Sequence, residues 1–564
     1  MISTKKHIQQ LAALLAAKNI IDIVVSPGSR NGALVQTLVG DGRFNCHNLV
    51  DERSAAYFAM GVSQAKQMPV ALLCSSGTAC LNYAPAVSEA YYQSIPLVLL
   101  TADRPEYWIN QLEAQCINQR GIYKNFVVDE IQLPLGESPQ ELSRANREIN
   151  RCLNMTLKTD KPVHINFPLE EPLYEFVEEE LPDHIRNIPH TTTISDLSVE
   201  KIELLLNRLN QSDEVLLLVG QMNPLDGLSE LIELFADSTG AVVLAEPLAN
   251  VQVSSKVANF DLLLSRLQPE SKEALRPELL ITIGGQLVSK RIKQFLREWQ
   301  PAEHWHIAAE AHYADTYWSL TDVLPVQPKL FFETMLSAFY DVNMGFKFNT
   351  PYRTKWTDLA LQTEQIFCEA AHDLSFTDMR VHQLLKTYIP QESIVHYGNS
   401  SSIRYGILFP SQAGTCYSNR GTSGIDGSFS TAVGFASTSA DINTVILGDL
   451  SFFYDSNALW NNDFPNNLRI IVLNNGGGNI FGLIPGPNKT QAFQKHFIAA
   501  HQFKIKGIVE AFGVAYLSAT DEKSLKESLD QVYNNKRRKA CVLEIFTNQE
   551  QNTTVYQQLF NTIK

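Results

Sequence analysis

Three features are scarce or missing in this sequence of 564 residues, and each narrows the class of protein. None of its eight cysteines forms a CxxC pair, and most stand among apolar or small residues. We therefore expect reduced, mostly buried thiols rather than disulfides or a zinc site. The sequence has no run of about 18 apolar residues, so no membrane-spanning helix is expected. Acidic residues exceed basic ones, giving a formal net charge of −14, so a broad nucleic-acid-binding face is not expected either.

What is present is typical of a folded cytoplasmic protein. Hydrophobic residues make up 45% of the chain and charged residues 19%. The first 19 residues contain three lysines and an apolar stretch, and a signal peptide also combines basic residues with an apolar stretch. However, the leucines and alanines recur at helical spacing among polar residues, and no small-residue cleavage site follows. We interpret this stretch as a first amphipathic helix.

The fold class follows from a repeated pattern. Short β-branched and leucine-rich runs recur along the chain, and each ends in Gly, Pro, Ser or Asn before a helix-like stretch. Strands that are apolar on both faces and alternate with helices are typical of parallel sheets covered by helices on each side. The sequence therefore predicts an α/β protein with doubly wound parallel sheets, whose strands lie within 20–30, 69–79, 95–105, 214–224, 241–247, 278–286, 443–451, 468–478 and 540–546.

Two stretches interrupt this rhythm. Residues 171–195 combine an acidic run, prolines and threonines, and residues 341–356 lack strand or helix periodicity. Both are typical of linkers. They divide the chain into three predicted α/β domains, at 1–186, 187–345 and 346–564.

Ligands of open parallel sheets bind beyond the carboxyl ends of the strands. In the first and third domains the residues after the strands are rich in glycine and polar side chains, as in SPGSR (26–30), TADRP (101–105) and GNSSSIR (398–404). The middle domain has fewer such residues, with GGQLVSKR (284–291) as the main exception. We therefore expect the chemistry in the first and third domains.

Two apolar strands of the third domain end in residues that can hold a metal ion. Asp449 follows the first strand, and Asn474 and Asn475 follow the second, before the glycines 476–478. Mg²⁺ prefers hard oxygen ligands and often shares them with phosphates. A carboxylate, an amide oxygen and a carbonyl of the glycine loop would supply three positions. An Asp after a strand is more often only a helix N-cap, so the pair carries the prediction.

The spacing of this pair resembles the fingerprint of the thiamine-diphosphate-dependent enzymes. The usual form there is GDG, whereas Leu450 stands here after Gly448 and Asp449. DERSAA (51–56), followed by SSGTACLNYAPAVSEAYYQ (75–93), resembles their pyrimidine-binding domain. Glu52 falls at the position of the glutamate that, in these enzymes, hydrogen-bonds the cofactor's aminopyrimidine. That hydrogen bond helps to generate the reactive ylid of the cofactor. The alternative for Glu52 is a surface acid stabilised by a helix dipole.

Longer strings narrow the resemblance. SPGSR, DERSAA, TADRP, GNSSSIR, SNRGTSGIDG (418–427) and GDLSFFYDSNAL (448–459) occur in this order along nearly the whole chain. Together they resemble a family of thiamine-diphosphate-dependent synthases of menaquinone biosynthesis, in which GDL is a usual form. The resemblance implies decarboxylation of 2-oxoglutarate and 1,4-addition of the succinyl carbanion to isochorismate. It implies thiamine diphosphate and Mg²⁺ as cofactors, with Mn²⁺ as a substitute, and a homodimer or homotetramer.

The same resemblance implies roles for individual residues. Both substrates are dianions, and arginine and lysine are the side chains suited to carboxylates. Isochorismate would contact Ser29, Arg30, Arg104, Gln115 and Lys290, and the donor's distal carboxylate would contact Ser400, Arg404 and Arg420. Glu52, Arg30, Gln115 and Ile425 would take part in catalysis, with Ile425 bending the cofactor. Ser400, Gly448, Leu450 and Gly477 would join Glu52, Asp449, Asn475 and Ile425 around the cofactor, and Asp449, Asn475 and Gly477 would bind the metal.

Several of these assignments have open alternatives. Arg30 and Arg104 could be structural clamps on neighbouring carbonyls, and the role of Gln115 could belong to Gln111 or Gln119. Lys290, beside Arg291 and Lys293, could lie on a solvated helix face, and Ile425 could be plain core. Other functions also compete: a decarboxylase or acetolactate-type synthase acting on small 2-oxo acids, a non-catalytic diphosphate-binding protein, or a nucleotide-binding middle domain. The sequence also shows no obvious catalytic histidine. No serine, cysteine or acid stands at motif spacing from His7, His47, His164 or His396.

Overall fold

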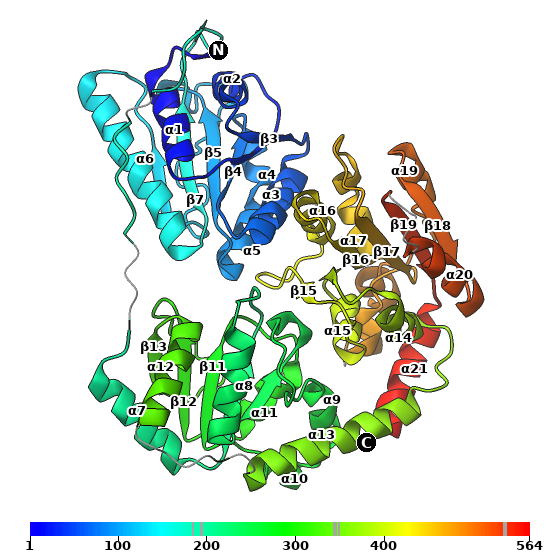
Figure 1. Cartoon of the computed structure of the whole chain (residues 1–564). Helices are drawn as coiled ribbons and strands as arrows, with labels where there is room; N and C mark the ends of the chain where they lie inside the picture. Colours follow the sequence, from blue (N-terminus) through cyan, green and yellow to red (C-terminus); the bar gives the residue numbers. More distant parts are fainter. Residues whose placement is uncertain (183–184, 192–195, 342–346, 348–349, 485, 534–538) are drawn as a thin grey trace.

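A computed structural model describes residues 1–182, 185–191, 196–341, 347, 350–484, 486–533 and 539–564. Three α/β units are visible in Figure 1, coloured blue to cyan, green, and yellow to red along the chain. Each is built on one parallel sheet, as the buried apolar strands of the sequence predict. The predicted boundary at 186/187 stays a prediction, and the boundary at 345/346 lies outside the described residues.

The first unit has a six-stranded parallel sheet in the described chain, with the order β3-β2-β4-β5-β7-β6. A short antiparallel pair, β1 (Ile2–Ser3) and β8 (Phe176–Val177), lies beside it. The strands are β2 (Asp22–Val25), β3 (Asn45–Asn48), β4 (Val70–Cys74), β5 (Leu97–Asp103), β6 (Asp129–Gln132) and β7 (Val163–Pro168). The helices are α1 (Lys6–Ala17), α2 (Gly32–Asp41), α3 (Glu52–Lys66), α4 (Thr78–Asn82), α5 (Ala84–Gln93) and α6 (Pro139–Thr159). The expected N-terminal amphipathic helix is confirmed as α1, which buries Ile8, Leu11 and Leu15.

The middle unit has five parallel strands among its described residues, in the order β10-β9-β11-β12-β13. They are β9 (Val215–Val219), β10 (Val242–Ala245), β11 (Leu279–Ile283), β12 (Glu303–Ala308) and β13 (Asp322–Pro325). Its helices are α7 (Val199–Gln211), α8 (Leu228–Thr239), α9 (Phe260–Arg266), α10 (Pro269–Glu273), α11 (Lys290–Glu298) and α12 (Pro328–Asp341). The helix α13 (Pro351–Ala370) then leads along the lower edge of Figure 1 to the third unit.

The third unit repeats the topology of the first. Its described strands follow the order β15-β14-β16-β17-β19-β18, so both sheets place their strands as second, first, third, fourth, sixth and fifth along the chain. They are β14 (Ser393–Tyr397), β15 (Thr415–Tyr417), β16 (Ile442–Gly448), β17 (Leu468–Asn474), β18 (Ala515–Ala519) and β19 (Cys541–Phe546). The helices are α14 (Asp378–Tyr388), α15 (Ser401–Leu408), α16 (Ser428–Thr438), α17 (Asp449–Tyr454), α18 (Ile480–Leu483), α19 (Lys506–Ala511), α20 (Glu522–Val532) and α21 (Gln549–Thr562).

Matching helices of the two repeated units, α3 and α16, pack against each other. Each follows the second strand of its own sheet, and their small residues allow a close approach: a Cβ added at Gly434 would lie 2.0 Å from the carbonyl oxygen of Phe58. Side-chain contacts flank this crossing, with Ser54 Oγ 2.8 Å from Ser430 Oγ and the Tyr57 hydroxyl donating to Asp426. One hydrophobic core therefore runs through both units.

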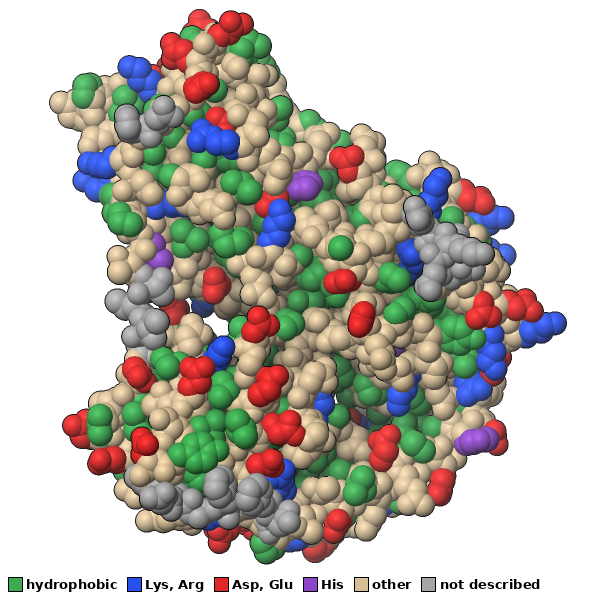
Figure 2. Space-filling model, viewed as in Figure 1, with side chains coloured by type: hydrophobic (Ala, Val, Ile, Leu, Met, Phe, Trp, Pro, Cys, Tyr) green, Lys and Arg blue, Asp and Glu red, His purple; other side chains and the backbone are tan. Residues whose placement is uncertain are grey.

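Other expectations from composition can be compared with the structure. All eight cysteines lie in the described part of the chain, where none forms a disulfide and five are buried, as predicted. No helix in the described ranges is both long and apolar enough to cross a membrane. On the face shown in Figure 2, basic side chains are scattered among acidic ones.

Candidate active site

The carboxyl ends of β16 and β17 bring Asp449 and Asn475 together. These strands are parallel neighbours in which Gly448 is paired with Leu473, so the next residues lie at one edge of the sheet. Asp449 is 1% exposed, and its two carboxylate oxygens accept three backbone hydrogen bonds. Gly476 and Gly477 donate to Oδ2 at 2.8 and 3.0 Å, and Leu450 donates to Oδ1 at 2.6 Å. Burial nevertheless raises the pKa of Asp449 to about 7, so a nearby cation would favour its charged form.

A histidine also faces this carboxylate. His501 Nε2 lies 3.3 Å from Asp449 Oδ2, and the backbone N–H of Phe503 donates to His501 Nδ1 at 3.1 Å. Burial lowers the pKa of His501. Because Nδ1 is an acceptor, the neutral ring carries its proton on Nε2, toward Asp449.

The two asparagines after β17 differ in their surroundings. Asn474 donates to Glu544 at 2.7 Å and to the Phe503 carbonyl at 3.0 Å, so it is tied into the structure. Asn475 donates through Nδ2 to Asp378 at 2.8 Å. Its Oδ1 atom is buried and accepts no hydrogen bond from the described residues. A buried amide oxygen with no donor is suited to a metal ion.

Of the glycines beside this pair, Gly448 leaves room for a ligand. No described atom lies within 4 Å of a Cβ added at Gly448, whereas Gly477 has a φ of +148°, which favours glycine. The Asp449 carboxylate, the Asn475 amide oxygen and the Gly477 carbonyl are three hard oxygen donors on the residues that follow β16 and β17, and the Gly477 carbonyl also accepts from the Asn479 backbone N–H at 3.0 Å. This set fits a divalent cation that carries a diphosphate.

Two arginines near the start of α15, Arg404 and Arg420, lie close enough for the charge of one to shift the pKa of the other. Arg404 donates to the Ser400 carbonyl at 2.8 Å, and Arg420 donates to the Asn399 side chain at 2.9 Å. Burial, and next the Arg404 guanidinium, lower the pKa of Arg420. Neither arginine forms an ion pair with a described acid, and Arg420 Nε is buried without a partner among the described residues. Two neighbouring arginines that form no ion pair with a described carboxylate are suited to an anionic ligand, although the charges of Glu246 and Glu89 also act on Arg420.

Ser400 and Ile425 lie beside this cluster. Ser400 has a φ of +74°, a conformation rare for a residue with a side chain. Ile425 is half-buried, so it is not plain core, and its carbonyl accepts a hydrogen bond from Ser451 at 2.8 Å.

Glu52 is the first residue of α3, but it is not the cap of that helix. The preceding Asp51 accepts hydrogen bonds from the backbone N–H groups of Arg53 and Ser54. Glu52 is half-buried and contributes to raising the pKa values of Cys74 and Cys80, after the larger effect of burial. Because Cys74 ends β4, Glu52 lies near the carboxyl edge of the first sheet.

Arg30 and Arg104 gather at the same edge. Arg30 is 6% exposed, donates to the Leu169 carbonyl at 3.1 Å and lies 3.4 Å from Glu171. Arg104 Nη1 lies 3.2 Å from Glu113. Burial, and next the charge of Arg104, lower the pKa of Arg30. Ser29 is exposed, and its carbonyl accepts a hydrogen bond from Tyr174.

The loop after β5 carries three glutamines, Gln111, Gln115 and Gln119. The sequence alone could not assign the predicted substrate contact to one of them. Gln115 is exposed at a φ of +53°, and its carbonyl accepts from Ser76 at 2.8 Å. Gln111 is also exposed. Gln119 is fully buried, donates to Asn166 at 2.9 Å and accepts from the Gly77 backbone. This burial removes Gln119 as a candidate for direct contact with a substrate.

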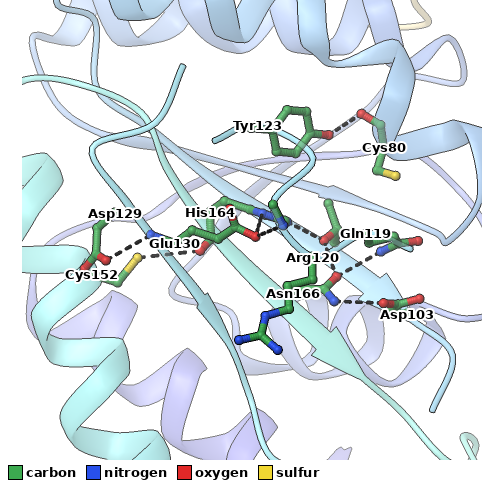
Figure 3. Close-up of polar contacts among 12 residues, drawn as sticks. Cys80, Asp103, Gln119, Arg120, Tyr123, Asp129, Glu130, Cys152, His164 and Asn166 are labelled. Carbon is green, nitrogen blue, oxygen red and sulfur yellow. Dashed lines mark hydrogen bonds and ion pairs between the residues drawn. The ribbon is translucent and has the colours of Figure 1, made fainter. Parts of the chain in front are cut away.

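A buried polar network supports this loop, as Figure 3 shows. Asn166 lies at its centre: it accepts from Gln119 and Thr101 and donates to Asp103 at 2.8 Å. Asp103 in turn accepts from the backbone of Arg104 at 2.7 Å. The network therefore fixes both the base of the loop and the start of the segment that carries Arg104.

Lys290 comes from the middle unit. It is the exposed first residue of α11, and Glu246 fixes the start of that helix by accepting from the backbones of Val288 and Ser289 at 2.7 Å each. Gln286 donates to the Gly421 carbonyl at 3.0 Å, so the middle unit touches the loop that holds Arg420. Among the described residues, no contact joins Lys290 itself to Arg30 or Arg104.

Three segments of the chain match known domain families, and all three families belong to thiamine pyrophosphate enzymes. Residues 5–122 match the family described as thiamine pyrophosphate enzyme, N-terminal TPP binding domain. Residues 195–396 match the middle domain of thiamine pyrophosphate, and residues 398–545 match the C-terminal TPP binding domain.

Curated relatives extend over the full length. The chain is 38% identical to the 2-succinyl-5-enolpyruvyl-6-hydroxy-3-cyclohexene-1-carboxylate synthases of Phocaeicola vulgatus and Bacteroides fragilis, covering 100% of this chain and 99% and 100% of those proteins. It is 36% identical to the enzyme of that name from Flavobacterium psychrophilum, over 98% of both chains. The chain belongs to this synthase family. The resemblance inferred from the sequence and the predicted three-domain α/β fold are thereby confirmed.

In this member of the synthase family, the predicted site residues fall into two groups plus Lys290. The edge of the third sheet carries Ser400, Arg404, Arg420, Ile425, Gly448, Asp449, Leu450, Asn475 and Gly477, and the edge of the first carries Ser29, Arg30, Glu52, Arg104 and Gln115. The predicted residues therefore follow strands of two different sheets, and we call these two groups the half-sites.

The sequence analysis missed three residues that support these half-sites. Asp378 binds Asn475, His501 faces Asp449, and the buried Glu89 accepts from the backbones of Gly421 and Thr422 beside Arg420. Asp378 and Glu89 lie far from their partners in sequence, at separations of 97 and 332 residues. No local motif could have revealed either pairing.

Proposed function

We propose that this protein is a thiamine-diphosphate- and Mg²⁺-dependent carboligase that transfers the succinyl group of 2-oxoglutarate, with loss of CO₂, to isochorismate. The product would be 2-succinyl-5-enolpyruvyl-6-hydroxy-3-cyclohexene-1-carboxylate, for menaquinone synthesis. Family membership supports the reaction, since the relatives carry that product in their names. Thiamine diphosphate, when bound, supplies the carbon nucleophile and the electron sink that decarboxylation of a 2-oxo acid requires.

One observation carries the choice of substrates. Arg404 and Arg420 lie together, largely buried, without an acidic partner among the described residues, and each hydrogen-bonds only a neutral oxygen. A small monoanionic 2-oxo acid would leave one of these charges unmatched. The distal carboxylate of 2-oxoglutarate would instead accept from both guanidinium groups, close to Ser400.

The other residues take complementary roles in this proposal. Asp449, Asn475 and Gly477 would hold Mg²⁺, or Mn²⁺ in its place, Gly448 and Leu450 would border the diphosphate, and Ile425 would keep the cofactor bent. Glu52 would accept a hydrogen bond from the aminopyrimidine. Arg30, Arg104, Ser29 and Gln115 bind and orient isochorismate, with Lys290 reaching in from the middle unit. Arg30 and Gln115 thereby also position the acceptor for attack.

The two half-sites support assembly as a homodimer or homotetramer. Glu52 and Asp449 must meet around one cofactor, but the residues that flank Glu52 already contact the third unit of the same chain. Arg53 donates to the Tyr454 carbonyl at 2.5 Å, and Asp51 accepts from Asn457 at 2.6 Å. In our proposal, the first unit of one chain therefore completes the site of the third unit of another.

The test is an assay of the purified chain with thiamine diphosphate, Mg²⁺ and 2-oxoglutarate, following CO₂ and product mass with and without isochorismate. We expect a succinyl adduct that disappears in Glu52→Gln and Asp449→Ala. Arg420→Gln should raise the KM for 2-oxoglutarate, whereas Glu106→Gln, at an exposed acid, serves as the control. Turnover of pyruvate in preference to 2-oxoglutarate would overturn the proposal in favour of an acetolactate-type synthase.

A further inference from the structure

The orientation of the Asn475 side chain is set by a single neighbour. Its nitrogen Nδ2 donates to Asp378 Oδ2 at 2.8 Å, while Oδ1 is buried and lacks a donor within the described residues. Both oxygens of Asp378 accept hydrogen bonds, Oδ1 from the Thr547 hydroxyl and Oδ2 from Asn475 Nδ2, so Asp378 pairs with the nitrogen of the amide and not with its oxygen. The oxygen is consequently turned away from Asp378.

Asp378 is itself held on several sides. It is the first residue of α14 and is 0% exposed. Its backbone N–H donates to Asn552 on α21 at 2.8 Å, and its Oδ1 accepts from the Thr547 hydroxyl, just after β19, at 2.5 Å. These contacts leave Oδ2 directed at Asn475. The carboxylate can therefore fix the amide without moving itself.

We propose that Asp378 is a positioning residue for the divalent cation: it holds the Asn475 amide so that Oδ1, and not Nδ2, faces the metal. This inference rests on the proposed function, since it assumes the cation at Asp449 and Asn475. The Asp378 carboxylate, which hydrogen-bonds the Asn475 amide, also fits the chemistry of a metal site. A group that hydrogen-bonds a metal ligand fixes the orientation of that ligand and makes it a stronger donor.

The alternative is that Asp378 only links α14 to β17. A link of that kind needs a hydrogen bond but does not depend on which atom of Asn475 faces the open side. The two roles therefore differ in one measurable property, the affinity for a divalent cation in folded protein.

Asp378→Asn is the decisive substitution. If the new amide keeps its oxygen toward Thr547, its nitrogen opposes Asn475 Nδ2, and two donors face each other. Asn475 must then rotate, which places its own nitrogen at the metal position, where it has no lone pair to offer. We expect the Kd for Mn²⁺ to rise about 10- to 100-fold. The full-length, EDTA-treated protein is titrated with Mn²⁺ at saturating thiamine diphosphate, and free Mn²⁺ is read by its electron paramagnetic resonance signal.

Two further variants separate orientation from stability. Thr547→Val removes the hydroxyl that donates to Asp378 Oδ1 but leaves Oδ2 as the acceptor for Asn475, so its Kd for Mn²⁺ should stay near that of the parent. The exchange variant Asp378→Asn/Asn475→Asp restores a donor and an acceptor with reversed roles, and again presents an oxygen to the metal. Its Kd should return toward the parent value.

The outcomes are distinct. Equal Kd values for the parent and Asp378→Asn would overturn the inference and leave the proposed function intact. Absence of Mn²⁺ binding by the parent would overturn both. If Asp378→Asn does not fold, the exchange variant decides: restored binding supports the inference, and a folded exchange variant without Mn²⁺ affinity overturns it.

Discussion

Gly61 of α3 lies directly against the backbone of Thr431 in α16. A Cβ added at Gly61 would stand 2.0 Å from the Thr431 carbonyl oxygen, closer than a non-bonded carbon atom can approach. This contact joins the first and third units, whose edges carry the two half-sites. The separation of these edges therefore depends on a residue with no side chain.

Gly61→Ala should destabilise the protein and lower its activity. The methyl group would force α3 and α16 apart, at a cost of about 1–3 kcal/mol or more. Thermal unfolding should show a lower Tm. Gly507→Ala in α19 is the matched control: no described atom lies within 4 Å of its added Cβ, so it should be neutral or slightly stabilising. Equal Tm values for Gly61→Ala and the parent would contradict this account of the interface.

The ion pair between Arg104 and Glu113 should compete with the acceptor substrate. Their side chains meet at 3.2 Å, and isochorismate must displace Glu113 to reach Arg104 in the proposed arrangement. We expect Glu113→Gln to lower the KM for isochorismate by up to about fivefold, since partly exposed ion pairs contribute about 0.2–1 kcal/mol. Glu106→Gln, on the same segment, should change nothing. A raised KM in Glu113→Gln would mean that Glu113 assists binding.

Glu89 should control the loop that carries Arg420. It is 1% exposed, and its two oxygens accept from the backbones of Gly421 and Thr422 at 2.6 Å each. In Glu89→Gln, an amide nitrogen would oppose one of these N–H groups, at a cost of about 1–3 kcal/mol. We expect a lower Tm and a higher KM for 2-oxoglutarate. Ser88→Ala is the control, because Ser88 donates only within α5; a KM unchanged in Glu89→Gln would refute the link to Arg420.

The buried Asp455 should make stability depend on pH. Burial raises the pKa of Asp455 to about 7, although Ser430 donates to it through both its N–H and its hydroxyl. Because the unfolded chain releases this proton near pH 4, the contribution of Asp455 to stability is greatest at low pH and falls as the pH rises to about 7.

Asp455→Asn removes this titration with little change of shape, since the Ser430 hydroxyl can rotate to accept from the new amide. The Tm of the variant relative to the parent should therefore rise between pH 5 and pH 8. Asp463→Asn, at an exposed acid, provides the control. A Tm difference that stays constant with pH would contradict the assignment of a buried proton to Asp455.

The site residues that the sequence predicted could be found for one physical reason: they directly follow buried strands of a parallel sheet. Asp449 and Asn475 follow apolar strands, and the parallel order of β16 and β17 places both at one edge. The sequence could not choose among Gln111, Gln115 and Gln119, because their spacing is equally compatible with a loop. The tertiary structure distinguishes Gln119 from the other two, because it is buried and hydrogen-bonds the Gly77 backbone and Asn166.

The sequence by itself determined the α/β class, the three sheets and the residues that follow their strands. It could do so because strand burial and strand ends are local properties, written in hydrophobic runs and the glycine or polar residues after them. Only the tertiary structure decided which partners hold those residues, as with Asp378 at Asn475, His501 at Asp449 and Glu89 beside Arg420. Hydrogen bonds between distant elements depend on how helices pack on the sheets, and no spacing along the chain encodes that packing.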